Sequence, residues 1–408
     1  MAMHAKIIED FFSDKEAQML NMLEHIVNLC SFTGDREGVE KVGRYLMDFL
    51  SAHGFYTKQI EKTEIPENEA WLNTHCDPFV AKSHPFDSEA GIVLAGHLDT
   101  VFPRAYCRER RFRIDFEKDR AYGPGVADMK AGLIANIFAA LALKENNLLV
   151  CPITLAFSTD EELGSPVSSR AIKQYAAGAR AAINAEPGGI GGFVTLSRKG
   201  SGHITLNVKG KSAHAGRNYQ DGASAILELA HKTLEIDKFL DISKSITVNT
   251  GLVEGGISAN SVAPAASSKI HITYQTREQG EELVKNIRTV ANSVFIEGTE
   301  TEMTGGLRLY PLERSEKGDM LFELAREAGK CFGMELRGQH YESASDSGFY
   351  SSVLNIPTIC CMGPEGDNIH TPDEYLIPST ILKRSKCIAL TALYAARKFK
   401  KPCSSEFH

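Results

Sequence analysis

Two histidines and three carboxylates of this chain are residue types that can hold a pair of divalent metal ions. These candidate ligands are His97, Asp128, Glu162, Glu186 and His370. Imidazole nitrogens and carboxylate oxygens are ligands that zinc accepts, and five of them suffice for two ions if one carboxylate bridges. A metal pair can activate water and polarise a carbonyl together. The pattern therefore predicts a two-metal hydrolase, with Glu161 left beside the metals as a proton carrier.

The charges of this set support the assignment. Asp128, Glu162 and Glu186 bring three negative charges, and a hydroxide would bring a fourth. Two divalent cations would balance these charges. Without metal, carboxylates crowded at one site would repel one another, and some would have to bind protons.

Glu161 and Glu162 are adjacent in FSTDEELGS and need separate roles. Neighbouring side chains of an extended segment point in opposite directions, so the two are not expected to bind one metal together. One can bind metal while the other takes a proton from water and returns it to a leaving amine. Asp99 follows His97 by two residues, so its carboxylate can accept the other ring N–H of that histidine and fix its tautomer.

The segments around these residues alternate between strand and helix patterns. The expected strands are the apolar runs 92–96, 153–158 and 181–186, and the expected helices cover 15–53 with a break near 31–34, 128–145 and 167–176. Such alternation is typical of a mostly parallel sheet covered by helices. Strands buried on both faces are continuously apolar, as these are.

The candidate ligands follow the expected strands. His97 comes after the run 92–96, Glu161 and Glu162 after 153–158, and Glu186 at the end of 181–186, while His370 follows TICCMG and a loop. Ligands of open α/β sheets bind beyond the carboxyl ends of the strands. Four separate loops thus bring ligand-type residues to the same edge of the sheet.

The pattern changes near residue 199. Residues 202–210 alternate apolar and polar side chains, as a half-exposed strand does. A helix, strands near 245–254 and 269–275, a helix near 278–294 and a strand near 301–309 follow, which is the order of a compact α+β unit of the ferredoxin-like kind. We therefore expect a catalytic domain at 1–199 and 314–408 and an inserted lid or dimerisation domain at 200–313.

Composition restricts the classes of binding partner and the cellular compartment that we expect. The 408 residues include 43% hydrophobic and 24% charged residues, which is ordinary for a soluble globular protein. The net charge of −7 argues against nucleic acid and against an anionic membrane surface as main partners. The nine cysteines form no regular framework, and we see no signal peptide or long apolar span. These features predict reduced thiols and a cytoplasmic protein.

Seven ordered segments resemble one enzyme family. They are GHLDTVFP, YGPGVADMKAG, STDEELGS, AEP, VKGKSAHAG, GGISANSVAP and NIHTPDE. They are similar to the co-catalytic zinc exopeptidases and deacylases typified by carboxypeptidase G, acetylornithine deacetylase and succinyl-diaminopimelate desuccinylase. The likeness runs from about residue 15 to 397, and GHLDTVFP and TDEELGS most resemble the glutamate carboxypeptidase branch.

The resemblance implies two zinc ions per chain, although cobalt or manganese suits the same ligands. His97, Asp128 and Glu186 would hold one ion. Asp128, Glu162 and His370 would hold the other, so Asp128 would bridge the pair.

The resemblance also implies roles for residues around the metals. Glu161 resembles the general base and acid, and Asp99 resembles the residue that supports His97. The peptide bond between Asp128 and Met129 would be cis.

In the inserted domain, the resemblance concerns substrate and subunit contacts. His214 is similar to a histidine that reaches the partner subunit's active site and stabilises an oxyanion, and Asn260 to an asparagine that contacts substrate. Both imply a homodimer. Relatives carry an arginine in a D-V-R segment, which reads HITYQTRE here, and Arg277 is not in the same register. Arg308 is a plausible substitute for binding a substrate carboxylate, because arginine can bind one through two hydrogen bonds.

Several activities fit these residues. The first is hydrolysis of an amide bond in a small peptide or N-acyl amino acid, either as a carboxypeptidase or as an N-acyl amino-acid deacylase. A non-catalytic ligand-binding relative is an alternative of another class, and the unliganded Glu161 argues against it. A two-metal phosphoesterase is disfavoured by the motif set and by the inserted SAHAG segment.

Overall fold

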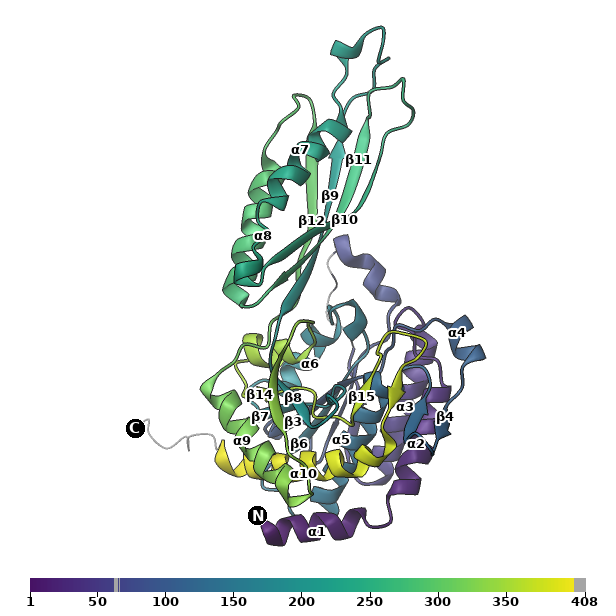
Figure 1. The fold of residues 1–408 in the computed structure, drawn as a ribbon, viewed down its shortest axis with the longest axis vertical. Helices are drawn as coiled ribbons and strands as arrows, with labels where there is room; N and C mark the ends of the chain where they lie inside the picture. Colours follow the sequence, from purple (N-terminus) through teal and green to yellow (C-terminus); the bar gives the residue numbers. More distant parts are fainter. Residues whose placement is uncertain (62–64, 66, 400–408) are drawn as a thin grey trace. The chain divides into compact units, whose positions relative to one another are not determined.

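The computed structural model of the chain describes all residues except 62–64, 66 and 400–408, and these residues form two compact units (Figure 1). The first unit contains the described residues within Met1–Ser197, Arg314–Tyr341 and Phe349–His408. The second contains Arg198–Glu313 and Glu342–Gly348. The sheets and hydrophobic cores of the two units are separate.

A six-stranded mixed sheet forms the centre of the first unit. Its strands, in spatial order, are β1 (Tyr56–Gln59), β2 (Phe79–Lys82), β6 (Ile153–Ser158), β3 (Ile92–His97), β7 (Ala181–Asn184) and β14 (Thr358–Ile359). The pairs β6–β3, β3–β7 and β7–β14 are parallel, whereas β1 and β2 extend the sheet antiparallel. The mostly parallel sheet predicted from the sequence is thus confirmed.

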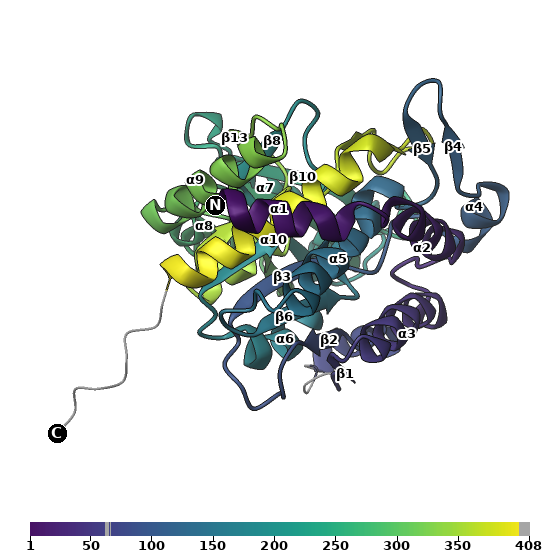
Figure 2. The ribbon, with the colours of Figure 1, turned by 90° about the horizontal axis from the view of Figure 1, so that it is seen from below.

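Both faces of the inner part of this sheet are buried, because successive side chains of its inner strands enter different cores. Ile92 and Leu94 belong to one core with the larger set of helices, and Val93 and Ala95 belong to a second core. The larger core includes α1 (Ala2–Phe12), α2 (Glu16–Asn28), α3 (Arg36–Ala52), α5 (Ala131–Glu145), α9 (Glu316–Cys331) and α10 (Ile381–Lys398). Figure 2 shows α1 and α5 beside α10 on this face. Helix α6 (Ser168–Ala176) packs in the second core.

The chain connections between the parallel strands change direction beside β3. The chain passes from β3 through α5 to β6 on one side, and then through α6 to β7 on the other side of β3. Where the connections after neighbouring parallel strands run in opposite directions, ligands of such folds bind at the carboxyl end of the sheet. His97 is the last residue of β3 and therefore stands at this point.

Small sheets and short segments complete the first unit. They are the sheet of β15 (Gly366–Asp367), β16 (Tyr375–Leu376), β5 (Arg120–Tyr122) and β4 (Arg113–Asp115), the pair β13 (Arg337–Tyr341) and β8 (Phe193–Arg198), and helix α4 (Arg104–Glu109). Val126–Glu145 is a helical stretch that is apolar and long enough to cross a membrane, but its apolar window is buried inside the unit. A core helix of a folded domain has the same composition.

The second unit has an antiparallel four-stranded sheet with helices on one face. Its strand order is β10 (Thr247–Gly255), β11 (Ala265–Tyr274), β9 (Gly200–Lys209) and β12 (Glu300–Leu309). Apolar residues of alternate positions pack against α7 (Ala225–Asp237) and α8 (Arg277–Asn292). This is the ferredoxin-like arrangement expected from the order of elements, and the alternation in β9 reflects one covered and one open face.

Two features of the fold differ from the sequence-based expectations. Helix α1 precedes the segment at residue 15 that was expected to begin the helical region. Residues Glu342–Gly348 group with the second unit, although the sequence analysis assigns all of 314–408 to the catalytic domain. The reason is local, because Arg198 donates hydrogen bonds to the carbonyl and hydroxyl of Ser343 at 2.8 and 2.9 Å.

Candidate metal centre

The carboxylate of Asp128 lies between two histidines, one on each oxygen. Its Oδ1 is 3.1 Å from Nε2 of His97, and its Oδ2 is 3.2 Å from Nε2 of His370. The His97 side chain is 1% exposed and that of His370 is 48% exposed, so the site is closed on one side and open on the other. This is the geometry of a carboxylate that can bridge two cations.

Local backbone structure brings Asp128 to this place. It lies in the turn Val126–Lys130 that precedes α5, and its peptide bond to Met129 is cis, as expected. Helix α5 then approaches the end of β7 very closely. A Cβ on Gly132 would lie 1.9 Å from the carbonyl oxygen of Ala185, so only glycine allows this approach. Asp128 and Glu186 are thereby brought to one side of the sheet edge.

Three glutamates complete the cluster from the ends of β6 and β7. Glu162 Oε2 lies 3.3 Å from His370 Nε2, and Glu186 Oε1 lies 3.9 Å from His97 Nε2. Two groups of potential ligand atoms lie within 4.8 Å of one another: His97, Asp128 and Glu162, and His97, Glu161 and Glu186. The structure therefore brings together all five candidate ligands and the candidate base Glu161.

Asp99 organises the loop that carries the two adjacent glutamates. Its Oδ1 and Oδ2 accept hydrogen bonds from the backbone N–H groups of Glu161 and Glu162, each at 3.2 Å, and Oδ2 also accepts one from the Thr33 hydroxyl at 2.8 Å. His97 Nδ1 lies 2.9 Å from the backbone carbonyl of Asp99, closer than the 3.5 Å to its carboxylate. The expected support of His97 thus involves the Asp99 main chain, while the side chain fixes Glu161 and Glu162.

Asp99→Asn should weaken metal binding by roughly 10- to 100-fold, the usual effect of losing such an orienting group. The asparagine NH2 group would take the place of one carboxylate oxygen and face a backbone N–H of Glu161 or Glu162. Two donors would then oppose each other, which displaces the segment that carries Glu162. Competition with a metal chelator measures the affinity. Asp160→Asn is the matched control, because Asp160 is equally buried and accepts from the backbone N–H groups of Val167 and Ser168. An equal loss in both variants would contradict the role of Asp99.

Glu374 is a site residue that the sequence analysis missed. Its Oε1 accepts hydrogen bonds from the backbone N–H groups of Ala127 and Asp128 at 2.9 and 3.1 Å. Burial raises the pKa of Glu374 to about 8, with the nearby Asp128 charge adding to the effect. The bonds tie the loop of His370 to the turn of Asp128. Its position four residues after His370 in HTPDE is the one sequence signal that could have identified it.

The cluster carries strongly perturbed proton affinities. Burial opposes the charged form of His97, but hydrogen bonds with Asp128 and Asp99 raise its pKa well above the usual value. Hydrogen bonds with Asp128 and Glu162 raise the pKa of His370 to about 11. Burial raises the pKa of Glu162, whereas the two histidines lower that of Asp128 despite its burial. Positive charge at the two imidazoles therefore compensates the buried carboxylates.

The donor set fits two divalent cations in place of those protons. Metal ligation needs neutral imidazole and ionised carboxylate, and each end of Asp128 offers one imidazole and at least one further carboxylate. Oε1 of Glu162 is buried without a hydrogen-bond partner among the described residues, although such atoms are normally paired. A cation at the Asp128–Glu162–His370 side would satisfy it.

His214 and Asn260 are brought together in the second unit. The segments that carry them form an antiparallel bridge between His214 and Ser261, and the N–H of Ala215 donates to the Asn260 carbonyl at 3.0 Å. His214 is exposed, and its Nδ1 accepts a hydrogen bond from the N–H of Gly216 at 3.2 Å. The neutral ring therefore carries its proton on Nε2, where it can be donated.

Arg308 lies elsewhere on the same sheet. The register of β12 with β9 shifts between Leu307 and Leu309, which places Arg308 in a bulge at the Gly202 end of β9. The His214 segment begins beyond the other end of β9, past Val208. Val208 is six positions along the strand from Gly202, a separation of roughly 20 Å. Arg308 is thus not grouped with His214 and Asn260.

Comparison with known proteins gives a consistent result. Residues 93–394 match the model of peptidase family M20/M25/M40. Carboxypeptidase G2 from Pseudomonas sp. (strain RS-16) is 26% identical over 379 residues, covering 91% of this chain and 88% of that protein.

Solved structures share the fold. A tripeptidase from Staphylococcus aureus has a TM-score of 0.73 at 20% identity, covering 94% of this chain and 99% of that one. An M20-family metallo-carboxypeptidase from Sulfolobus solfataricus has a TM-score of 0.71 at 17% identity, covering 93% and 99%. With the family model spanning most of the sequence, the chain belongs to peptidase family M20/M25/M40 and is a carboxypeptidase-like metallopeptidase.

Proposed function

We propose that this metallopeptidase hydrolyses the amide bond that joins a C-terminal amino acid to a small peptide or an acyl group. The observation that carries the proposal is the bridging position of Asp128, with its two oxygens directed at His97 and His370 and with Glu161 buried in the same cluster. The similarity to carboxypeptidase G2 supports release of an amino acid with a free carboxylate.

In such a reaction the metal ligands and Glu161 would have different roles. Two bound divalent cations, which we take to be zinc, would polarise the scissile carbonyl and lower the pKa of water. Glu161 is 8% exposed, and its main chain is fixed by Asp99. In this proposal a Glu161 carboxylate oxygen takes the proton of the attacking water and passes it to the leaving nitrogen.

Residues of the second unit would bind the rest of the substrate. The Nε2–H of His214 is a donor suited to the developing oxyanion, and Asn260 lies in the segment paired with it. Arg308 would bind the substrate carboxylate. Arg308 on β12 lies beside the Gly202 end of β9, whereas the His214 segment follows the other end of β9, and we therefore propose that His214 serves the active site of the partner subunit of a homodimer.

The surface of the second unit supports a homodimer. Strand β10 is at the edge of its sheet and leaves Leu252 and Val253 58% and 61% exposed. Leu234 on α7 is 67% exposed. An unpaired edge strand with apolar side chains is usually covered in the native assembly.

The eight described cysteines are free thiols, which supports the cytoplasmic assignment.

A substrate panel tests the proposed function. The zinc- or cobalt-loaded protein is given peptides and folyl-type conjugates that end in Glu or Asp, and N-acetyl and N-succinyl amino acids. Turnover of the first set, with release of the C-terminal amino acid, supports the carboxypeptidase. Turnover of the second set alone would restrict the proposed activity to N-acyl amino acids, as in a deacylase. Binding without turnover would contradict the proposal and make the protein a ligand-binding relative.

Arg308→Ala should raise KM for substrates with a free C-terminal carboxylate by roughly 10- to 100-fold, because a charged hydrogen bond contributes about 1.5–3 kcal/mol. Substrates whose carboxylate is amidated should be affected much less. Steady-state kinetics on each pair of substrates measures the difference. Arg288→Ala on α8 is the control for loss of a positive charge from an exposed position of the same unit. Equal effects on both substrates would remove Arg308 from the carboxylate site.

A further inference from the structure

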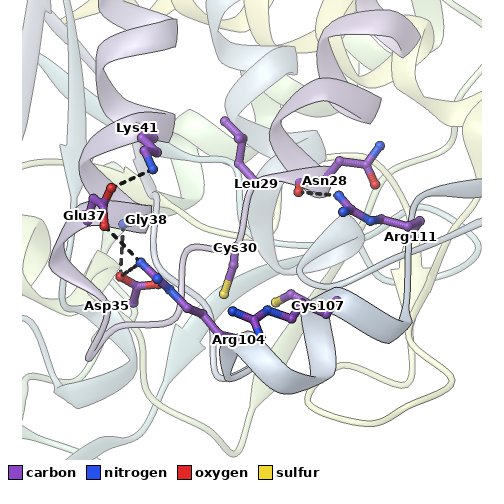
Figure 3. Close-up of a pocket in the computed structure, with 11 residues that line it drawn as sticks. Asn28, Leu29, Cys30, Asp35, Glu37, Gly38, Lys41, Arg104, Cys107 and Arg111 are labelled. Atoms are coloured by element: carbon purple, nitrogen blue, oxygen red, sulfur yellow. Dashed lines mark hydrogen bonds and ion pairs between the residues drawn. The ribbon is translucent and has the colours of Figure 1, made fainter.

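A pocket in the first unit contains two cysteines that the metal centre does not use. It has a volume of about 250 Å³ and lies among the segment after α2, the start of α3 and helix α4. Cys30 comes from the first of these and Cys107 from the last, so the two are 77 positions apart in sequence. Figure 3 shows both sulfur atoms on the same side of the pocket, directed toward one another. We call this site the thiol pocket.

The two thiols converge on one carbonyl group. The sulfur of Cys30 lies 3.7 Å from the Phe102 carbonyl oxygen, and that of Cys107 lies 3.5 Å from the same atom. Both cysteines are free. Cys107 is 6% exposed, whereas Cys30 is partly exposed. A reagent from solution therefore meets Cys30 first, with Cys107 behind it.

The rim of the thiol pocket is positively charged. Four of its side chains are cationic (Lys41, Arg104, Arg108 and Arg111) and two are anionic (Asp35 and Glu37), which leaves a charge of +2. Arg104 is paired with both carboxylates and Lys41 with Glu37, so these charges are largely neutralised. Arg108 and Arg111 thus supply the excess charge, in a chain whose net charge is −7.

The surroundings favour the ionised form of Cys30. Hydrogen bonding with the Cys107 thiol lowers the pKa of Cys30 to about 6, burial opposes this change, and the Phe32 backbone and the buried Lys130 add to it. The Lys130 ammonium donates to the carbonyl of Leu29, the residue before Cys30. Reactive cysteines are thiolates in electropositive, partly exposed surroundings.

We propose that the thiol pocket is a thiol–disulfide exchange site for an anionic low-molecular-weight disulfide, with Cys30 as the attacking thiol and Cys107 as the resolving thiol. The Cys30 thiolate attacks one sulfur of the small disulfide, whose other half leaves as a thiolate and takes a proton. The Cys107 thiol then loses its proton and attacks the Cys30 sulfur, which displaces the second half. Two protein thiols are oxidised to one disulfide, and one small disulfide is reduced to two thiols.

The test uses the full chain and glutathione disulfide as the probe. After alkylation of remaining thiols, peptide mapping should find a Cys30–Cys107 disulfide in the wild-type protein, reversed by a dithiol reductant. Cys107→Ser should stop at one glutathione on Cys30, and Cys30→Ser should leave Cys107 unmodified. Cys331→Ser, which removes the exposed cysteine of α9, should behave as the wild type. Unmodified Cys30 in the wild-type protein, or modification that depends on Cys331, would overturn the proposal.

A second arm tests the recognition of negative charge. Arg108→Gln with Arg111→Gln should slow the reaction with glutathione disulfide by roughly tenfold, because the local field raises the encounter rate of an anion. The rate with uncharged 2-hydroxyethyl disulfide should change by less than about twofold. Arg326→Gln on α9, outside the pocket, is the control. Equal slowing with both disulfides would overturn the anionic specificity.

Discussion

Glu161→Gln should lower kcat by a factor on the order of 10²–10⁴, the usual contribution of general acid–base catalysis. Glutamine has nearly the same shape, and the backbone N–H of residue 161 can still donate to Asp99. The amide cannot accept the proton of the attacking water. Metal content should stay at about two ions per chain, because the proposed ligands are unchanged. Steady-state kinetics measures kcat, and elemental analysis of the same sample measures the metal content.

The comparison with Glu162→Gln makes this experiment decisive. Glu162 lies 3.3 Å from His370 and is a proposed ligand, so its substitution should release metal as well as activity. Glu161 also belongs to a group of potential ligand atoms with His97 and Glu186. If Glu161→Gln lost one metal ion, Glu161 would be a ligand, and another group would have to carry the proton. Retained turnover would exclude it from both roles.

The candidate metal centre was predictable because most of its residues directly follow predicted strands in the sequence. His97, Glu161 and Glu186 each follow a continuously apolar run, and parallel strands deliver such residues to one edge. The period of the side chains also predicted the second unit, where one face of β9 is covered. These features depend on short stretches of sequence, so a single chain is enough to read them.

Contacts between distant segments were not predictable in the same way. Thr33 is bonded to Asp99 across 66 positions, and Glu374 to Asp128 across 246. Nothing in the spacing of these residues indicates the pairing, because it arises only when α2, β3 and the His370 loop are folded together. The same holds for Glu342–Gly348, whose place is decided by Arg198 rather than by its own sequence. Sequence patterns thus pointed to the candidate ligands but not to the hydrogen bonds that orient them.

Mixed dimers should show that His214 acts on the partner subunit. A dimer of one Glu161→Gln chain and one His214→Ala chain would have one site with an intact Glu161 and the partner's intact His214. Co-expression with two affinity tags isolates this species, which should retain about half of the wild-type activity, since one of two symmetric sites is complete. Each homodimeric variant should be reduced by about 10²-fold or more.

The reciprocal dimer separates the two possible arrangements. When both substitutions are on one chain and the other chain is wild type, action across the dimer leaves neither site complete, and activity should be nearly lost. Action within one chain would instead leave the wild-type chain active, and would abolish activity in the first mixed dimer. The two dimers contain the same four side chains in total, so differences in stability or metal affinity cannot produce opposite results. Only the subunit that His214 serves distinguishes them. Action across the dimer is the expected outcome because roughly 20 Å of β9 separates Gly202, beside Arg308, from Val208, beyond which the His214 segment begins.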